Sequence, residues 1–427
     1  MKISIIGTGY VGLVSAVGLA ELGHEIWGVN RSPEKIEKLK KGQQIFYEPG
    51  LSKLLKKNLK KNRLHFGTDL EEAINNTDYV FICVGTPPKK DGGADLSAVK
   101  TVAKQIAKVA KRNLIVIDKS TVPIGTARMV QSILNKNKHK FEVVSSPEFL
   151  REGKAVEDFF HGDRLLIGAD NKQTAKKVAN IYSKLKTHKM ITDLETAELT
   201  KYASNAFLAT KISFINEIAN LCEKVGANVE EVAYGMGLDR RINQYFLNAG
   251  IGYGGSCFPK DVKALNHISK VNGFDFKILK AVLDVNERQR KLVYNKAKKE
   301  LGSLKGKTVT ILGLAFKDNT DDIRESPAID LIKWFSKAGS KVKAYDREAQ
   351  ENSKMLLKDK ATWSKNPYDA CKNSQLVIIA TEWPSFKNLD WAKIKRSMKK
   401  KVIIDGKNLL SRDKMEKLGF KYIGVGK

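Results

Sequence analysis

The sequence predicts an α/β protein with two doubly wound (Rossmann-like) parallel sheets, joined by a long central helix and further helical segments. Short apolar runs alternate with amphipathic stretches in the first third of the chain, and the same alternation restarts in the last third. Strands that alternate with helices predict a parallel sheet with helices on both faces. Between these regions, residues 194–225 carry apolar side chains three and four positions apart, which is the period of one long helix.

In the first third, strands are predicted at 2–7, 24–29, 79–85, 114–120 and 141–147, with helices at 11–22 and 33–41. In the last third, strands are predicted at 307–313, 341–346, 375–384 and 402–409, after a mostly helical stretch at 259–299. QLVIIATEWP at 375–384 echoes YVFICVGTPP at 79–88. This echo indicates a weak internal repeat of a whole domain architecture, too long in period for a solenoid.

The length of 427 residues exceeds one ordinary core and favours two or three domains. We expect a dinucleotide-binding domain over 1–192, a helical domain over 193–300 and a second sheet domain over 301–427, with a ligand cleft between the sheets. Asp193 is suited to cap the start of the long helix, and Gly226 is suited to end it.

The formal net charge is +29, from 76 lysines and arginines against 47 aspartates and glutamates. This surplus suits either a nucleic-acid-binding protein or an enzyme of an acidic small substrate with a lysine-rich surface. The enzyme is favoured, because lysines dominate and are spread over helix faces such as 53–61. Nucleic-acid-binding surfaces usually depend on arginine and interleaved aromatic residues, so no nucleic-acid partner is expected.

No apolar run reaches the roughly 18 residues of a membrane span, and the glycine-broken N-terminus is typical of a strand and turn, not of a signal peptide. The cysteines are far apart and show no metal-ligand spacing: Cys83, Cys222, Cys257 and Cys371. We therefore expect a cytoplasmic protein in a reducing compartment, with no membrane partner and no metal.

The segment Gly7-Thr8-Gly9-Tyr10-Val11-Gly12 follows a predicted strand and opens a predicted helix. Gly7 permits the tight turn, Gly9 lets a pyrophosphate approach the backbone, and Gly12 allows close packing of helix on strand. The context of strand, glycine turn and helix predicts a dinucleotide site.

The end of the second predicted strand bears on the choice between NAD and NADP. An acidic residue there would hold the ribose hydroxyls and favour NAD, but the chain has Asn30. Arg31 and Ser32, with Lys35 shortly after, could bind a 2′-phosphate, so we expect NADP to be accepted. The alternative stays open that Arg31 only stacks on adenine and NAD is the cofactor.

The segment GYGGSCFPKD at 252–261 surrounds Cys257 with glycines, Lys260 and Asp261. The glycines would let a substrate come close to backbone amides, which can donate hydrogen bonds. A cysteine is more often a small buried apolar residue, as we expect for Cys83. In the polar, glycine-rich setting of Cys257, Lys260 and a following helix N-terminus would favour the reactive thiolate. The segment therefore predicts a nucleophilic cysteine.

Seven ordered motifs resemble the UDP-glucose dehydrogenase family, within the wider UDP-glucose/GDP-mannose dehydrogenase superfamily. They are GTGYVGL, ICVGTPP, KSTVPIGT, SPEFLREG, ELTKYASNAFLATKISFINE, GYGGSCFPKD and GLAFKDNTDDIRES, between residues 7 and 326. The resemblance implies two successive hydride transfers from a primary alcohol of a UDP-sugar, here UDP-glucose. The aldehyde is then held on a cysteine as a thiohemiacetal, oxidised to a thioester and hydrolysed to the acid, and Cys257 stands in that position.

The resemblance also implies roles for further side chains. Lys201 would stabilise oxyanions, and Asn205, four residues later on the same helix face, would bind the sugar hydroxyl or a water. Glu148 is the favoured general base for thioester hydrolysis, with Asp261 assisting or orienting, and the two are not distinguished. Thr121 matches a position near the catalytic water. Without the resemblance, Lys201 and Asn205 would be expected on an exposed helix face, and Glu148 and Glu152, two glutamates four residues apart, would be expected to face solvent.

By the same resemblance, further cofactor contacts are expected from Tyr10, Val11, Thr86, Pro87, Thr121, Glu152, Lys260 and Arg324. Further substrate contacts are expected from Phe149, Leu150, Arg151, Glu152, Tyr245, Gly254, Phe258, Lys317 and Lys407. Family members commonly carry arginine where Lys407 stands, which leaves the role of this lysine open. Arg241 matches a residue that reaches the active site of a neighbouring subunit, which implies a homodimer or larger homo-oligomer.

Three alternatives remain. Within the family, the substrate could be GDP-mannose or a UDP-N-acetyl sugar. A hydroxyacid dehydrogenase would share the early fold but would perform one oxidation and need no thiol. A nucleic-acid-binding protein with a decayed dehydrogenase fold would show salt-sensitive binding and no turnover.

Overall fold

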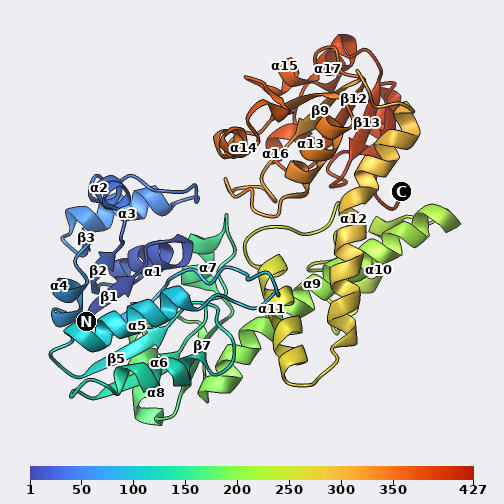
Figure 1. Ribbon diagram of the computed structural model, residues 1–427. Helices are drawn as coiled ribbons and strands as arrows, with labels where there is room; N and C mark the ends of the chain where they lie inside the picture. The colour runs from blue at the N-terminus through green and yellow to red at the C-terminus, as the bar shows by residue number, and fades with distance from the viewer. The chain divides into compact units, whose positions relative to one another are not determined.

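The computed structural model describes residues 1–427, which form two compact units, Met1–Ser204 and Asn205–Lys427. Each unit contains one sheet (Figure 1). The division falls within the long helix α9 (Leu194–Val225), whose bounds match the predicted range. Asp193 Oδ1 accepts a hydrogen bond from Thr196 N at 2.7 Å, and Gly226 takes a positive φ of 77° where the helix ends, so both expected terminal residues are confirmed.

The N-terminal unit contains an eight-stranded sheet in the order β3-β2-β1-β4-β5-β6-β7-β8. Six of its seven neighbouring strand pairs are parallel, and only β6 and β7 run antiparallel to each other. The strands are β1 (Lys2–Ile6), β2 (Glu25–Val29), β3 (Leu64–Gly67), β4 (Tyr79–Ile82), β5 (Leu114–Asp118), β6 (Phe141–Ser145), β7 (Arg164–Ala169) and β8 (His188–Thr192).

Helices cover both faces of this sheet and form a separate apolar core on each. One core contains residues of α1, α3, α7 and α8, and the other contains residues of α4, α5 and α6. The helices are α1 (Tyr10–Glu21), α2 (Pro33–Lys40), α3 (Leu51–Lys60), α4 (Leu70–Asn75), α5 (Ser97–Val109), α6 (Thr126–Leu134), α7 (Ala155–His161) and α8 (Lys172–Ile181).

The C-terminal unit continues from α9 through three helices, α10 (Val229–Gly237), α11 (Phe258–Val271) and α12 (Lys277–Leu301). Its six-stranded parallel sheet has the order β11-β10-β9-β12-β13-β14. The strands are β9 (Thr308–Leu312), β10 (Lys341–Tyr345), β11 (Thr362–Trp363), β12 (Leu376–Ile379), β13 (Val402–Asp405) and β14 (Lys421–Ile423).

The helices that cover the second sheet also form two cores, one with α12, α13 and α14 and one with α15, α16, α17 and α18. Their bounds are α13 (Pro327–Lys337), α14 (Gln350–Leu357), the short 3₁₀ helix η1 (Lys358–Lys360), α15 (Pro367–Cys371), α16 (Pro384–Lys387), α17 (Trp391–Ser397) and α18 (Arg412–Lys417).

The first six strands of the N-terminal sheet and the six strands of the C-terminal sheet have the same spatial order, 3-2-1-4-5-6. This is the order of the dinucleotide-binding fold, so the weak sequence echo reflects two sheets of one architecture. Every predicted strand is present. Five further strands, β3, β7, β8, β11 and β14, were not predicted. β8 carries mostly exposed side chains and β11 has two residues, so neither gives an apolar alternation.

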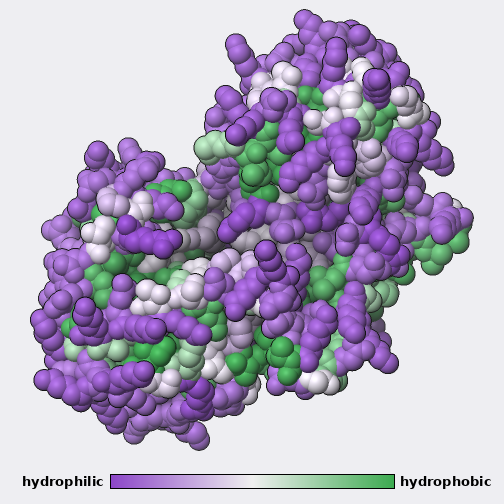
Figure 2. Space-filling model, in the orientation of Figure 1, coloured by the Kyte–Doolittle hydropathy of each residue, from purple (hydrophilic) through white to green (hydrophobic).

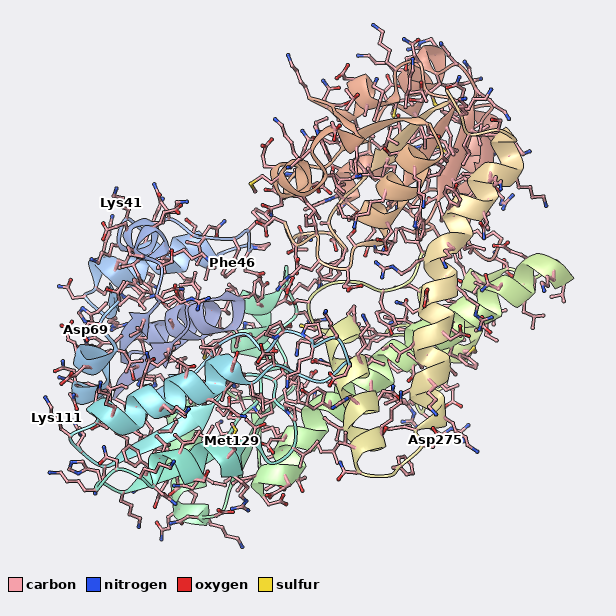
Figure 3. The ribbon with its side chains drawn as sticks, viewed as in Figure 1. Lys41, Phe46, Asp69, Lys111, Met129 and Asp275 are labelled. Carbon is pink, nitrogen blue, oxygen red and sulfur yellow. The ribbon has the colours of Figure 1, made fainter.

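The lysines of the N-terminal unit lie largely outside its cores. Figure 3 shows Lys41 and Lys111 pointing away from the sheet, and both are exposed. None of the helices is both long and apolar enough to cross a bilayer. On α9, however, two members of the apolar series, Leu199 and Leu221, are exposed instead of buried.

The glycine turn between β1 and α1 is shaped by close approach of the backbone. A Cβ on Gly12 would lie 1.8 Å from the carbonyl oxygen of Gly7, and Gly7 takes a φ of 98°. Gly9, in contrast, has no atom within 4 Å of the position of a Cβ and a φ of −72°. Gly12 is therefore required by packing within the protein, whereas the space beside Gly9 is open.

We predict that Gly12→Ala lowers the stability of the protein, whereas Gly9→Ala affects dinucleotide binding and not stability. Helix propensity favours alanine at position 12, but the clash with Gly7 should outweigh it and lower the melting temperature by roughly 5 °C or more. Gly9→Ala should leave the melting temperature within about 2 °C, because its methyl group meets nothing. It should weaken dinucleotide binding, measured by fluorescence titration. A stable Gly12→Ala protein would refute this account of the turn.

Candidate active site

The turn before α1 has the features of a pyrophosphate site. Gly7 N donates to Val29 O at 2.9 Å, which fixes the turn against the end of β2. Gly9 is the exposed N-cap residue of α1 and provides no side chain to cap the helix. The backbone N–H groups at the start of a 12-residue helix, with open space beside Gly9, fit an anionic dinucleotide.

Asn30 and Ser32, at the end of β2, are held by local hydrogen bonds. Asn30 donates through Nδ2 to Thr8 Oγ1 at 2.9 Å and accepts from Ser32 N at 2.9 Å. Ser32 Oγ accepts from Lys35 N and caps α2. Arg31 is exposed. Asn30 thus braces the turn, and Arg31 is the side chain of this group that projects into solvent.

The segment that carries Thr121 follows β5. Thr86, which is buried, donates through Oγ1 to the carbonyl oxygen of Thr121 at 2.8 Å, and Pro87 beside it is exposed. The carboxylate of Glu198 on α9 accepts from Gly125 N at 2.6 Å and from Ala127 N at 2.8 Å. Burial raises the pKa of Glu198 to about 7, against the lowering effect of these two backbone hydrogen bonds. Sequence reasoning missed Glu198, because its partners lie more than 70 residues earlier.

Glu148 forms a buried ion pair with Lys201. The Oε1–Nζ distance is 3.4 Å, and both side chains are 5 % exposed. Glu148 Oε2 also accepts from Leu150 N at 2.6 Å. Without the family resemblance, these two residues would be expected on the surface. The structure shows that this expectation is wrong. A buried charge that loses its partner is strongly unfavourable. The pairing therefore holds both side chains in place.

A second buried lysine lies at this pair. Lys119 Nζ donates to Ser146 Oγ at 3.5 Å, and burial lowers its pKa to about 8. Glu148 acts on this pKa in the opposite direction, and the charge of Lys201 lowers it further. Lys119 was not singled out from the sequence, although its place in KSTVPIGT beside the end of an apolar strand was a possible signal.

The segment 149–152 is held mainly by its own unit. Phe149 lies beneath the guanidinium of Arg164, 3.9 Å from the ring centre, and beside Lys201 at 5.1 Å. Arg151 donates from its backbone N and its side chain to Asp158. The backbone N–H groups of Leu150 and Arg151 are thus engaged within the protein. Glu152 is buried, contrary to the surface position that its spacing alone indicated.

In the C-terminal unit, Cys257 is the N-cap residue of α11 and is partly exposed. Its Sγ lies 3.5 Å from Ser256 Oγ. Cys83, Cys222 and Cys371 are buried, and burial raises the pKa of the Cys83 and Cys371 thiols to about 12. The positive end of the helix dipole at the start of this 14-residue helix favours a thiolate. Cys257 is therefore the thiol that is both accessible and placed where its ionised form is stabilised.

The glycines before Cys257 are required by packing within the unit. A Cβ on Gly254 would lie 2.3 Å from Glu325 O, and one on Gly255 would lie 2.7 Å from the ring of Phe316. The sequence interpretation attributed these glycines to the approach of substrate. The structure gives an additional reason, which is contact with the 316–325 segment.

The buried residues Asn205 and Asp261 form a cluster with Lys260, whose side chain is partly exposed. Asn205 Nδ2 donates to Asp261 Oδ2 at 2.6 Å, and Lys260 Nζ donates to Asp261 Oδ1 at 2.6 Å. Asp261 is 1 % exposed and also donates through its backbone N to Cys257 O at 2.8 Å. Both carboxylate oxygens of Asp261 therefore hold neighbouring side chains, and Asn205 is oriented by one of them.

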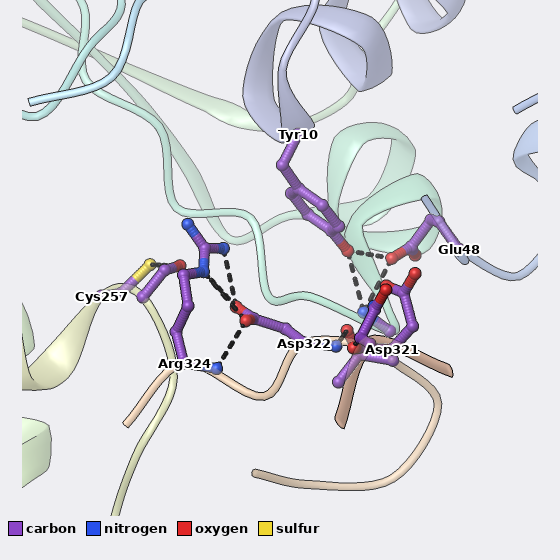
Figure 4. A network of polar contacts seen from close by, with 10 residues as sticks. Tyr10, Glu48, Cys257, Asp321, Asp322 and Arg324 are labelled. Atoms are coloured by element: carbon purple, nitrogen blue, oxygen red, sulfur yellow. Dashed lines mark hydrogen bonds and ion pairs between the residues drawn. The ribbon is translucent and has the colours of Figure 1, made fainter. Parts of the chain in front are cut away.

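Arg324 forms a bidentate pair with Asp322, with Nε–Oδ1 at 2.9 Å and Nη2–Oδ2 at 2.7 Å (Figure 4). Lys317 lies 5.4 Å from the ring centre of Phe316. Phe258 packs beside the rings of Phe246 and Tyr253. Nowhere in the chain do three or more histidine, cysteine, aspartate or glutamate side chains gather in a way that could hold a metal ion.

A pocket of about 480 Å³ lies within the C-terminal unit. Tyr245 and Lys407 line it, together with residues of α10 and the loop 244–249. Lys407 Nζ pairs with Glu382 at 2.8 Å. Arg241 is highly exposed and pairs only locally, with Asp239 at 2.6 Å. The predicted site residues therefore fall into two groups, one in each unit.

Three family models match consecutive parts of the chain. The NAD binding domain of the UDP-glucose/GDP-mannose dehydrogenase family matches residues 1–186, its central domain matches 195–288, and its UDP binding domain matches 310–412.

Individual proteins are similar over the whole chain. UDP-glucose 6-dehydrogenase TuaD of Bacillus subtilis is 45 % identical over 429 residues, covering 100 % of this chain and 93 % of that protein. The structure of a UDP-glucose dehydrogenase from Pyrobaculum islandicum is similar with a TM-score of 0.94 and 40 % identity, covering 99 % and 97 % of the two chains. A UDP-D-ManNAc dehydrogenase from Pyrococcus horikoshii has a TM-score of 0.87 and 28 % identity, covering 100 % and 99 %.

Proposed function

Because this chain belongs to the UDP-glucose/GDP-mannose dehydrogenase family, we propose that it oxidises the primary alcohol of UDP-glucose to the carboxylate of UDP-glucuronate. The named UDP-glucose dehydrogenases are 40–45 % identical to it, against 28 % for the UDP-D-ManNAc dehydrogenase, which supports UDP-glucose over an N-acetylated sugar. Residues 1–192 would bind the dinucleotide, 193–300 would supply the nucleophile, and 301–427 would bind the UDP portion. We assign the reaction to the cytoplasm, where the free thiols stay reduced.

One observation carries this proposal: Cys257 is a partly exposed thiol at a helix N-terminus, beside the Asn205–Asp261–Lys260 cluster. A single oxidation of an alcohol needs no thiol. An aldehyde, however, has no hydride-donating alcohol until a nucleophile adds to it. An accessible thiol in this polar setting therefore supports a reaction that continues from the aldehyde to the acid.

The bound nicotinamide supplies the hydride acceptor, once in each of two oxidations. In the first, the alcohol gives its proton to a water and its hydride to the nicotinamide and becomes the aldehyde, and the ammonium group of Lys201 stabilises the negative charge on its oxygen. Asn205, oriented by Asp261, holds the oxygen or a water by its amide. Residues of the 149–152 segment hold the sugar.

The Cys257 thiolate then adds to the aldehyde carbon, forming a C–S bond and an oxyanion. Loss of the second hydride converts this adduct to a thioester. Glu148 takes a proton from a water that attacks the thioester carbon, the C–S bond breaks, and the thiolate is released. Glu148 is the favoured candidate for this base, and Asp261 orients Asn205 and Lys260. Thr121 would help to position the water.

We predict that the wild-type protein reduces two nicotinamides per UDP-glucose and that Cys257→Ser does not complete the second oxidation. A serine hydroxyl is rarely ionised near neutral pH and forms no thioester, so steady turnover should fall by roughly a thousandfold or more. NADH absorbance and chromatography of the sugar products measure this stoichiometry, with a panel of UDP- and GDP-sugars as substrates.

Cys222→Ser is the matched control, because Cys222 is a buried thiol in an apolar cluster, and it should keep the ratio of two. Normal turnover of Cys257→Ser would contradict the mechanism. Activity only with GDP-mannose or an N-acetylated sugar would overturn the substrate, and a ratio of one would favour a hydroxyacid-type dehydrogenase.

For the cofactor, the family model identifies an NAD binding domain, and we propose that NADP is also accepted. Asn30 stands where a carboxylate would repel a 2′-phosphate, and its amide is committed to Thr8 and Ser32. The exposed guanidinium of Arg31 is then the group available for the phosphate.

We predict that Arg31→Ala lowers kcat/KM for NADP by roughly tenfold and changes the value for NAD by less than threefold. Lys38→Ala on α2 removes an exposed positive charge seven residues after Arg31 and serves as the control for a general field effect. Initial rates at fixed UDP-glucose, with each of the two cofactors, give the six kcat/KM values of the wild type and the two variants. A wild-type protein that does not use NADP would remove this part of the proposal.

We also propose that the protein is a homodimer, with α9 at the interface. Phe207, Phe214 and Leu221 follow each other at intervals of seven residues, so they lie on one face of α9, and all are exposed. Figure 2 shows apolar surface over the region of α10 as well, where Leu238 is exposed. A two-fold axis lets one helix face pack against its own copy and cover such a row.

Subunit mixing tests both the dimer and the role of Arg241 across the interface. Arg241→Ala and Cys257→Ser should each be inactive alone. Unfolded together and refolded in equal amounts, they should recover about a quarter of the wild-type activity, because half of the dimers are mixed and each has one intact site. Each variant refolded alone is the control. A monomer by light scattering, or no recovery, would refute this arrangement.

A further inference from the structure

Glu48 is a buried carboxylate that the mechanism above does not use. It lies in the connection between α2 and α3 and is 2 % exposed. A carboxylate removed from water is costly unless its oxygens are hydrogen-bonded. Its hydrogen bonds therefore show what this position is built to hold.

Both oxygens of Glu48 accept hydrogen bonds from the start of α7. Oε2 accepts from Gly153 N at 2.7 Å, and Oε1 accepts from Ala155 N at 2.7 Å. These partners are more than 100 residues later in the chain. The carboxylate thus fixes a distant backbone segment, and does not brace its own turn.

The hydroxyl of Tyr10 completes this group. It donates to Glu48 Oε2, and its oxygen accepts from Gly153 N at 2.9 Å (Figure 4). The ring of Tyr10 packs on Phe46, two residues before Glu48, with centres 4.7 Å apart; Figure 3 labels Phe46. Burial and the charge of Glu48 raise the pKa of Tyr10, so the hydroxyl stays a donor.

The two ends of this network belong to different binding segments of the same unit. Tyr10 is the first residue of α1 and follows Gly9 of the dinucleotide turn. Gly153 directly follows the 149–152 segment, and Ala155 lies two residues later. This segment contains the residues assigned to the sugar and itself follows Glu148. Glu48 and Tyr10 therefore form the connection between the two.

We propose that Glu48 is a positioning residue of the oxidation: with Tyr10, it holds the 149–155 segment at a fixed distance from the first turn of α1, so that sugar and nicotinamide are aligned for hydride transfer. This inference rests on the proposed function. A simple cap of α7 explains the bond to Ala155 N, but it explains neither the second oxygen nor the tyrosine.

Glu48→Gln and Tyr10→Phe test this role through kinetics. The glutamine amide would turn an N–H group toward a backbone N–H, and phenylalanine would remove the hydroxyl. Hydride transfer depends steeply on alignment, so each variant should lower kcat/KM for UDP-glucose by roughly tenfold or more. If both act through one network, the double variant should be within about threefold of the worse single variant.

Tyr368→Phe is the matched control, because the Tyr368 oxygen accepts from Asp390 N at 3.1 Å in the other unit. It removes the same kind of hydroxyl and should leave kcat/KM unchanged. A purely structural role of Glu48 would lower the melting temperature of its variants and leave kcat/KM unchanged well below that temperature, and this result would overturn the proposal.

Hydrogen exchange without ligand provides a readout that does not need UDP-glucose turnover. Peptides covering 149–157 should exchange at least about tenfold faster in Glu48→Gln and in Tyr10→Phe, with peptides of the second sheet unchanged. Unchanged exchange in 149–157 overturns the proposal whatever the substrate is. A wild-type protein that does not oxidise UDP-glucose refutes the proposed function, and exchange then still decides whether Glu48 and Tyr10 hold the segment. If Glu48→Gln does not fold, exchange of 149–157 in Tyr10→Phe provides the same test.

Discussion

Parallel pairing of the strands is the constraint on which the position of the functional side chains depends. In a parallel sheet all carboxyl ends meet at one edge, and the loops after them carry the polar groups. In the N-terminal unit, Asn30 follows β2, Thr86 follows β4, Thr121 follows β5 and Glu148 follows β6. In the C-terminal unit, Lys407 follows β13. Residues far apart in the chain are thereby brought to one edge of each sheet, without any sequence feature that joins them.

Buried charges then fix these side chains. Glu148 pairs with Lys201 and acts on the pKa of Lys119, Asp261 holds Asn205 and Lys260, and Glu48 holds the start of α7. Each of these carboxylates is 5 % exposed or less. Buried ionised groups contribute little net stability, but an unpaired one is expensive, so they penalise every arrangement other than the native one. The protein thus uses buried charges to position its functional side chains and the start of α7.

The sequence was sufficient for the features that depend on local pattern. The apolar period fixed the bounds of α9, and the glycine turn with its neighbouring strand and helix identified the start of α1. Contacts between distant residues were not accessible in this way. Glu48 and Glu198 have no periodic signal, because their partners lie 105 and 73 residues away. Likewise, spacing alone indicated solvent exposure for Glu148 and Glu152, whereas the loop after β6 turns both inward. Edge strands such as β8 carry too few apolar residues to be recognised.

The uninterrupted helix α9 also limits how this chain can vary in length. Lys201 and Asn205 are joined by one helical turn, and the range 194–225 contains neither glycine nor proline. Each residue of an α-helix advances the backbone by about 100° around the axis. An insertion or deletion of one residue between these two side chains would rotate them out of phase, and no loop is present there to absorb the error. Chimaeras with related chains should therefore tolerate a crossover within α9 only when both parents keep the same helical phase.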